Sequence, residues 1–114
     1  MKKVILTCIS VLLLAACSVQ EPLYNWDKYE TNSYNYLKKS DDDSTQKLME
    51  TYQKMIDKPR GSRNVVPPGI YADYGYVLLQ ANKTQEGKKM LQKEIEMYPE
   101  SKVFIDRILK MLEE

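Results

Sequence analysis

The chain has 114 residues, with 17 basic and 16 acidic side chains and no histidine. This near-neutral balance argues against nucleic-acid binding, which relies on basic patches. The lack of histidine excludes His-based metal sites and His general bases. A chain of this length is expected to form one small domain around a single apolar core.

The N-terminus has the pattern of an export signal. Lys2 and Lys3 precede an apolar run, residues 4–16, that is shorter than the about 20 residues a membrane-spanning helix needs. Leu14-Ala15-Ala16-Cys17 resembles the lipobox of bacterial lipoproteins. The resemblance implies cleavage after Ala16, attachment of diacylglycerol to the Cys17 thiol and acylation of the new amino group. A plain secretory signal with an incidental cysteine is the alternative.

Removal of the signal, residues 1–16, would change the inventory of the chain. Two of the basic side chains leave with it, so the net charge falls from +1 to −1. Cys8 also leaves and Cys17 carries lipid, so neither a disulfide nor a thiol nucleophile is expected. Ser18 after the cysteine implies, by the same resemblance, an outer-membrane anchor with the protein facing the periplasm. Residues 17–22 are then a tether, and residues 23–114 are one helical domain.

An aromatic segment follows the tether. Trp26, Tyr29, Tyr34 and Tyr36 are interspersed with asparagines, in a stretch too short and polar to bury all four rings. Tyrosine and tryptophan are enriched at protein interfaces, so these four residues are the predicted partner-binding site. Two alternatives stay open. The segment could be a helix docked on the rest of the domain, or its rings could stack on sugars such as those of peptidoglycan.

The acidic stretch at 40–44 predicts the start of an amphipathic helix over 43–58. Asp43 is the expected N-cap, and Gln46 completes a capping-box pattern. Apolar residues then recur at three- and four-residue spacing, which is typical of a helix with one buried face. They are Leu48, Met49, Tyr52, Met55 and Ile56. Residues 59–62 end the helix, and the prolines in 64–69 predict a loop.

The second half predicts three more helices. One runs over 70–81 after Pro68, and a turn separates it from a helix capped by Thr84 and stopped at Pro99. Ser101 is the expected cap of the last helix, residues 101–114, with Ile105, Ile108, Leu109 and Leu112 on one side. No segment shows sustained period-two alternation, so the predicted fold class is all-α.

Residues 67–99 resemble a tetratricopeptide repeat. The resemblance places an apolar–glycine pair at Tyr74-Gly75 and a small residue at Gly87, where the two helices approach closely. It implies antiparallel helix pairs, with the last helix as a C-terminal cap. Glu94 departs from the pattern, which usually has a small residue there, and is expected to loosen packing against whatever follows this repeat. Residues 43–58 match only as a degenerate repeat, and a generic helical bundle is the alternative.

As a whole, the chain resembles a family of small proteobacterial lipoproteins of unassigned function. The resemblance rests on the lipobox, the aromatic stretch over 24–38 and the segment VPPGIYADYGYVLL that begins at Val66. In that family the gene often neighbours one for a lipoprotein like the curli-export pore component. The resemblance therefore implies a role in an envelope or secretion assembly, with such a lipoprotein as partner. It supplies no catalytic residues.

The side chains themselves indicate no reaction. The serines lack a nucleophile-elbow context, and Asp41-Asp42-Asp43 lacks EF-hand spacing. We therefore expect no enzyme activity, no metal and no cofactor beyond the covalent lipid on Cys17. The predicted function is an outer-membrane-anchored, non-catalytic adaptor for another envelope protein. Binding of peptidoglycan or another glycan through the aromatic segment is the alternative.

Overall fold

A computed structural model describes residues 1–5 and 19–114. The predicted lipid anchor, Cys17, lies outside the described residues. Residues 19–114 form helices and loops, and no strand occurs in the described part, which confirms the predicted all-α class. The elements are α2 (Tyr29–Lys39), α3 (Asp42–Asp57), α4 (Ile70–Gln80), α5 (Thr84–Met97), the 3-10 turn η1 (Pro99–Ser101) and α6 (Lys102–Met111). None of the described helices is long and apolar enough to cross a membrane.

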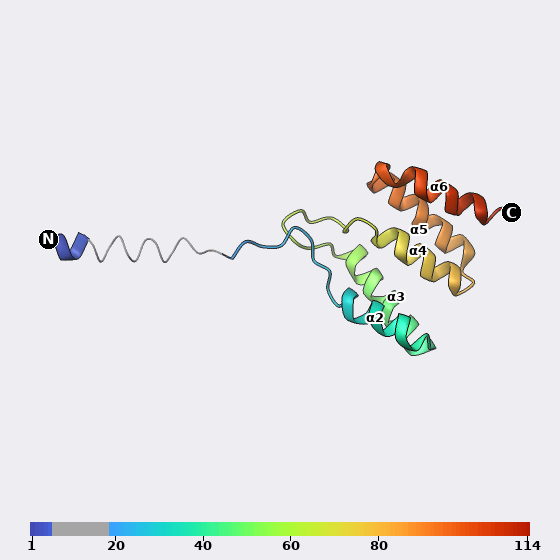
Figure 1. Cartoon of the computed structure of the whole chain (residues 1–114), viewed down its shortest axis with the longest axis horizontal. Coiled ribbons are helices and arrows are strands. Elements are labelled where there is room, and N and C mark those ends of the chain that lie inside the picture. Colours follow the sequence, from blue (N-terminus) through green and yellow to red (C-terminus); the bar gives the residue numbers. More distant parts are fainter. Residues whose placement is uncertain (6–18) are drawn as a thin grey trace.

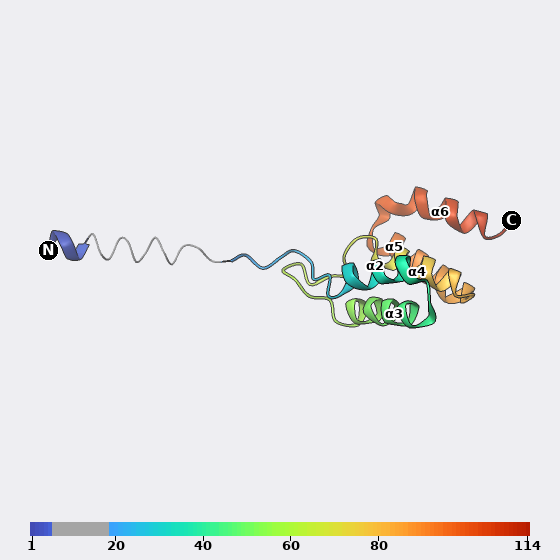
Figure 2. The same ribbon diagram turned by 60° about the horizontal axis from the view of Figure 1, so that its bottom comes forward.

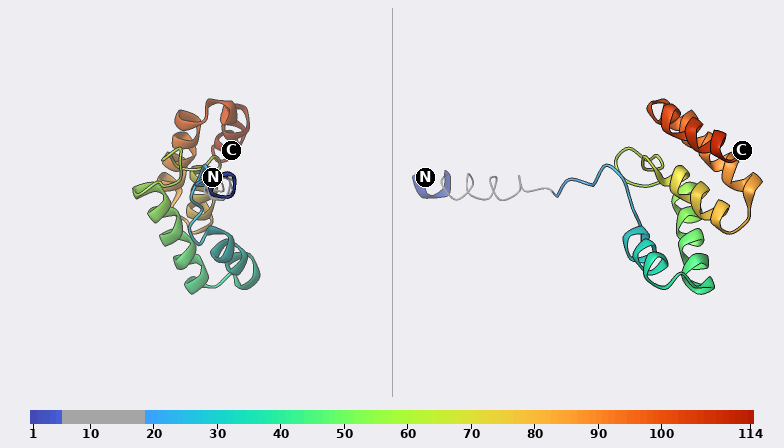
Figure 3. Two further views of the ribbon diagram at one scale, coloured as in Figure 1. Left: turned by 90° about the vertical axis from the view of Figure 1, so that its left-hand side faces the viewer. Right: turned by 45° about the vertical axis from the view of Figure 1, so that its right-hand side comes forward.

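The helices pack in chain order. α2 pairs with α3, α4 pairs with α5, α3 contacts α4, and α6 packs on α5 (Figure 1). Figure 2 shows α3 at one side of this array and α6 at the other. The two connections within the pairs are short, Ser40-Asp41 and residues 81–83, so each pair is antiparallel (Figure 3). The aromatic segment is thus largely a docked helix, which was one of the two alternatives to a contact surface.

The start of α3 differs from the prediction. Asp41, rather than Asp43, is the N-cap: its carboxylate accepts a hydrogen bond from the Ser44 backbone N–H at 2.8 Å. Ser44, rather than Gln46, completes the capping box by accepting from the Asp41 backbone N–H. The cap lies earlier than predicted because Ser40, in a left-handed conformation, ends α2 and reverses the chain. α3 therefore begins at Asp42, two residues after Ser40. The hydrogen bonds from Ser44 lower the pKa of Asp41 below its ordinary value.

The core lies between the helix pairs. It includes the apolar face predicted for α3 together with residues from the following loop and α4, and its buried members are Leu48, Tyr52, Met55, Val66, Ile70 and Val77. Tyr71 and Tyr74 are partly buried and pack against it. Leu78, Leu91 and Ile105 are also buried, which extends the apolar interior across α4, α5 and α6. Ile105 thus places the last helix on the domain.

Two glycines set the spacing of α4 and α5. A Cβ atom at Gly75 would lie 2.9 Å from the Gly87 carbonyl oxygen, and one at Gly87 would lie 2.8 Å from the Gly75 carbonyl oxygen. Real Cβ atoms do not approach backbone oxygens this closely, so only glycine fits at both positions without a backbone shift. The predicted close approach at Gly87 is confirmed.

Glu94 has a role that the sequence did not predict. Its side chain is 3% exposed, and its carboxylate accepts hydrogen bonds from the backbone N–H groups of Gly69, at 2.8 Å, and Ala72, at 3.3 Å. These donors belong to the first turn of α4, which otherwise has no side-chain cap. The carboxylate therefore joins α5 to the start of α4, where the helix dipole favours a negative charge.

The other predicted caps are not side-chain caps. Thr84 is the first residue of α5, and the N-cap position is held by Lys83 without a side-chain hydrogen bond. Ser101 precedes α6, but its hydroxyl donates to the Tyr98 carbonyl at 2.6 Å and so stabilises the η1 turn instead. Asn82, in a left-handed conformation, reverses the chain between α4 and α5. Asparagine tolerates that conformation better than most residues, which explains the tight turn.

Candidate functional site at the root of the tether

The chain enters the domain beside the loop that follows α3. The Pro22 carbonyl accepts from the Ser62 backbone N–H at 2.9 Å, and the Leu23 carbonyl accepts from that of Arg63 at 3.1 Å. Gly61 permits this contact: its φ is +91°, and a Cβ atom there would lie 2.6 Å from the Leu23 carbonyl oxygen. The point where the tether meets the folded domain is therefore fixed on the loop at 58–64.

Aromatic rings lead from this point into the core. Neighbouring ring centroids are 6.3 Å apart for Tyr24 and Trp26, 5.8 Å for Trp26 and Tyr29, and 5.9 Å for Tyr29 and Tyr52. The row ends with Tyr52 stacked on Tyr74 at 5.2 Å. Aromatic pairs at such distances contribute about 0.5–1.5 kcal/mol beyond their buried area. The aromatic row therefore holds the N-terminal segment and α2 onto α3 and α4.

The structure divides the four predicted partner-binding residues. Tyr29 and Tyr36 are half-buried and pack against the core. Trp26 is 43% exposed, and Tyr34 is 61% exposed on the outer side of α2. The four rings therefore do not share one surface, because the helical repeat turns residues 29 and 36 inward and residue 34 outward. Trp26 and Tyr34 are the two that a partner can reach most readily.

Tyr29 also links α2 to α4 by a polar contact. Its hydroxyl donates to the Asp73 carboxylate at 2.6 Å. Burial, reinforced by the hydrogen bond and the negative charge of Asp73, raises the pKa of Tyr29 to about 12. Burial likewise raises the pKa of Tyr52, which lies deeper in the core. The raised pKa values mean that these two hydroxyls lose their protons only at a higher pH than an ordinary tyrosine does.

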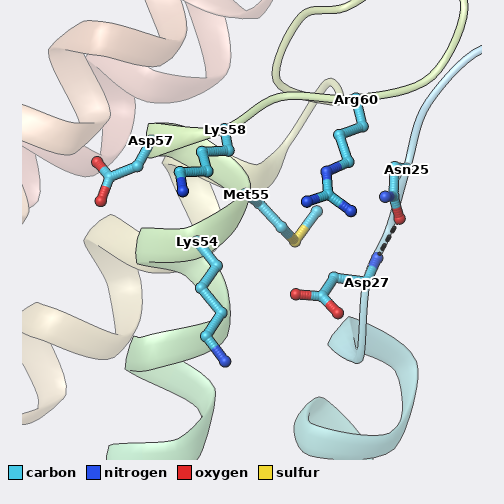
Figure 4. A pocket seen from close by; sticks show the side chains of 7 residues that line it. All are labelled: Asn25, Asp27, Lys54, Met55, Asp57, Lys58 and Arg60. Atoms are coloured by element: carbon cyan, nitrogen blue, oxygen red, sulfur yellow. Dashed lines mark hydrogen bonds between the residues drawn. The ribbon is translucent and has the colours of Figure 1, made fainter.

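A polar pocket opens beside the aromatic row. Its volume is about 340 Å³, and it is lined by Asn25, Asp27, Lys54, Met55, Asp57, Lys58 and Arg60. Figure 4 shows Arg60 and Met55 reaching into the space between α3 and the segment that carries Asn25 and Asp27. The Asp27 backbone is held by its N–H, which donates to the Asn25 side-chain oxygen at 2.8 Å.

The basic side chains around this pocket form no ion pair with any residue that the structure describes. Lys47, Lys93 and Lys102 each pair with a carboxylate elsewhere in the domain. Among the described residues, by contrast, neither Lys58 nor Arg60 forms a salt bridge. Their charges are therefore available to a ligand or surface. Within residues 1–5 and 19–114, no group of three or more acidic or cysteine side chains is placed to hold a metal ion.

A second exposed feature, on α6, was missed by the sequence reasoning. Val103, Phe104 and Met111 are 66%, 63% and 65% exposed, although they lie in the last helix of the array. The sequence predicted only the stripe of α6 that includes Ile105, which docks on the domain. The missed signal was the excess of apolar residues: α6 carries more of them than one buried face can use.

The fold defines a small all-helical module. Residues 23–108 match the family described as a domain of unknown function (DUF4810), and the chain belongs to this family. The match spans the aromatic segment, both helix pairs and most of α6. No curated protein and no solved structure is significantly similar to the chain.

Proposed function

We propose that the protein is a lipid-anchored, non-catalytic interaction module of the bacterial envelope, held at the outer membrane by Cys17. The lipobox-like Leu14-Ala15-Ala16-Cys17 supports the anchor, because a charged start and a short apolar run precede it. The tetratricopeptide-like spacing of residues 67–99 supports a role in binding protein, since repeat helices commonly present such surfaces. The partner is another envelope protein, for which a curli-export-like lipoprotein is the leading candidate.

The observation that carries this proposal is the outer face of α6. A helix that caps an array normally has a polar outer face, because the cap faces water. Here Phe104 is 63% exposed, and Val103 and Met111 are equally open. Exposed apolar side chains grouped in this way mark interaction surfaces more often than isolated ones do. The described helices therefore leave this side of α6 uncovered.

The chemistry of the face suggests its occupant. α6 already packs on α5. On its open side the exposed Arg107 lies one turn from both Phe104 and Met111, and such a mixture of apolar and charged side chains suits an amphipathic helix. We propose that a helix of the partner stacks on α6 as the next layer of the array. Phe104 would be the anchor of that contact, because large aromatic side chains dominate interface energetics.

Co-purification tests this arrangement. The lipidated wild-type chain, Phe104→Ser and the control Lys110→Ser are extracted from outer membranes in mild detergent, and bound envelope proteins are identified by mass spectrometry. We expect Phe104→Ser to lose a partner that Lys110→Ser keeps. Equal recovery in all three would contradict the α6 interface. Size measurement of the purified chain separates a second copy of the protein from a different partner.

The exposed residues of the N-terminal segment form a second proposed contact. Trp26 and Tyr34 keep that role here, whereas Tyr29 and Tyr36 contribute through packing that holds α2 in place. The double variant Trp26→Ala/Tyr34→Ala is expected to weaken partner recovery less than Phe104→Ser. Equal or greater loss would move the main interface to α2.

Glycan binding is the second candidate function. The supporting observation is the half-exposed ring of Trp26 beside polar Asn25 and Asp27, since aromatic platforms with polar neighbours suit sugar stacking. Sedimentation with purified peptidoglycan tests it. Retention of the wild-type chain, but not of Trp26→Ala, would favour this function over the adaptor.

A further inference from the structure

We propose that the basic side chains at the root of the tether, above all Lys58 and Arg60, bind the phosphate headgroups of the membrane that anchors the chain. This inference rests on the proposed lipidation of Cys17. It adds an orientation to the anchor: the end of the domain with the pocket faces the lipid, and α6 is left open to a partner.

The tether is too short to carry the domain far from the membrane. Four residues separate Cys17 from Pro22, and each of the five Cα-to-Cα steps spans at most about 3.6 Å, so Pro22 stays within about 18 Å of the acylated residue. Pro22 and Leu23 are then bound to Ser62 and Arg63 by backbone hydrogen bonds. The loop at 58–64 therefore cannot move far from the membrane surface.

The charge of that loop favours contact with a phosphate-bearing surface. Lys58, Arg60 and Arg63 are its charged residues, and all three are basic and exposed. The Arg63 guanidinium already donates one hydrogen bond, to the Tyr24 hydroxyl at 3.1 Å. Lys58 and Arg60 form no salt bridge with any described residue, and Lys54 lines the same pocket.

Acidic groups face the same region and limit its charge. Asp27 and Asp57 line the pocket, and Glu21 lies in the tether. The Asp57 carboxylate already accepts from the Gln53 side chain at 2.9 Å, and Figure 4 shows it pointing away from Asp27. A surface with adjacent cations and carboxylates matches headgroups that carry both a phosphate and an amine, such as phosphatidylethanolamine, as well as anionic ones.

The opposite end of the molecule provides the comparison. The turn between α4 and α5 lies at the end of the domain remote from the tether (Figure 1). Lys83 and Lys89, in and after this turn, are also exposed. A double charge reversal there changes the net charge by the same amount without touching the proposed membrane face.

The experiment uses the full lipidated chain in vesicles of phosphatidylethanolamine and phosphatidylglycerol that contain a dansyl-headgroup lipid. Trp26 is the chain's single tryptophan and lies next to the pocket residues, so energy transfer from it to dansyl reports how close this end is to the headgroups. The wild-type chain is compared with Lys58→Glu/Arg60→Glu and with Lys83→Glu/Lys89→Glu. Circular dichroism and intact mass verify the fold and the lipid in each protein.

We expect strong energy transfer from Trp26 to dansyl in the wild type and in Lys83→Glu/Lys89→Glu. In both proteins this energy transfer should weaken as salt is added. Lys58→Glu/Arg60→Glu should lower the ratio of docked to undocked domain by about tenfold or more, because each basic side chain near an anionic surface contributes a several-fold factor. Equal, salt-independent transfer in both variants would overturn the inference while leaving the anchor intact. A chain recovered without lipid would overturn both. If Lys58→Glu/Arg60→Glu keeps the wild-type energy transfer but loses an envelope protein in the co-purification experiment, the loop at 58–64 binds protein instead of lipid.

Discussion

Glu94 of α5 accepts a hydrogen bond at 2.8 Å from the backbone N–H of Gly69, the N-cap residue of α4. The buried carboxylate thus supplies from α5 the cap that α4 lacks at its own N-terminus. This contact fixes where the second helix pair begins, directly after the loop at 58–69 that meets the tether.

Glu94→Ala is expected to destabilise the domain by about 1–2 kcal/mol, because it leaves the part-buried N–H groups of Gly69 and Ala72 without their acceptor. Urea unfolding measures the change. Glu96→Ala is the control: Glu96 lies on the same helix but makes only a surface ion pair with Lys93, so its loss should cost well under 1 kcal/mol. Similar losses in the two variants would contradict the capping role.

Gly75→Ala is expected to destabilise the domain by about 1–3 kcal/mol, even though alanine is the better helix former by about 1 kcal/mol. The added methyl would meet the Gly87 carbonyl oxygen at 2.9 Å and the Leu91 side chain at 3.0 Å, so the helices must separate. Thermal unfolding checks this, with the exposed Gln92→Ala as control. A stabilised Gly75→Ala protein would show that α4 and α5 do not approach as described.

Alkaline pH should weaken the attachment of α2. The Tyr29 pKa is raised from 10.0 to about 12 in the folded chain, chiefly by burial and then by the hydrogen bond to Asp73. Below pH 10 both the folded and unfolded states hold this proton, so the contribution of Tyr29 to stability is complete. Between about pH 10 and 12 the unfolded state loses the proton first, so that contribution declines as the pH rises.

Tyr29→Phe is expected to reduce the decline of stability between pH 10 and 12, at a cost at neutral pH of at most about 1 kcal/mol for the exposed hydrogen bond. Unfolding free energies measured across this pH range test the prediction. Tyr34→Phe is the matched control, because the Tyr34 ring points outward from α2, and it should leave the decline unchanged. If the unfolding free energy of Tyr29→Phe declines between pH 10 and 12 as steeply as that of the wild type, Tyr29 is not the source of the decline.

Cys17→Ala should remove the acyl chains and release the protein from the outer membrane, because only a thiol can form the thioether to diacylglycerol. Membrane fractionation and intact mass measure both effects. Cys8→Ala is the control: Cys8 lies within the proposed signal, so the mature chain should be unchanged. Outer-membrane recovery of Cys17→Ala at the wild-type level would contradict lipid anchoring.

Sequence periodicity predicted the helices well, because their buried faces are regular. Leu48, Tyr52 and Met55 are buried on α3 at the predicted spacing, and Gly87 lies at the predicted close approach. Helix starts were less predictable: Asp41 and Asp43 are equally suitable caps, and the choice depends on how α2 ends. The role of Glu94 could not be predicted locally, since its donors lie on another helix.

The candidate site was only partly predictable. The aromatic segment was recognised, but which rings turn inward depends on the docking of α2, and Tyr29 and Tyr36 pack against the core. Trp26 and Tyr34 are the exposed members. The pocket joins Asn25 to Arg60 across the fold, a pairing that no local pattern contains. The exposed apolar residues of α6 are visible in the sequence, but the helix was predicted to be a C-terminal cap, which would have a polar outer face.

Site-specific photo-crosslinking in intact cells tests the central claim most directly. A photoreactive phenylalanine analogue replaces Phe104 on α6 or, as the control, Glu100 in η1, which is also exposed. We predict one discrete crosslinked envelope protein from position 104, absent from position 100 and lost when Cys17→Ala is added. No crosslink at position 104 above the level at position 100 would contradict the account.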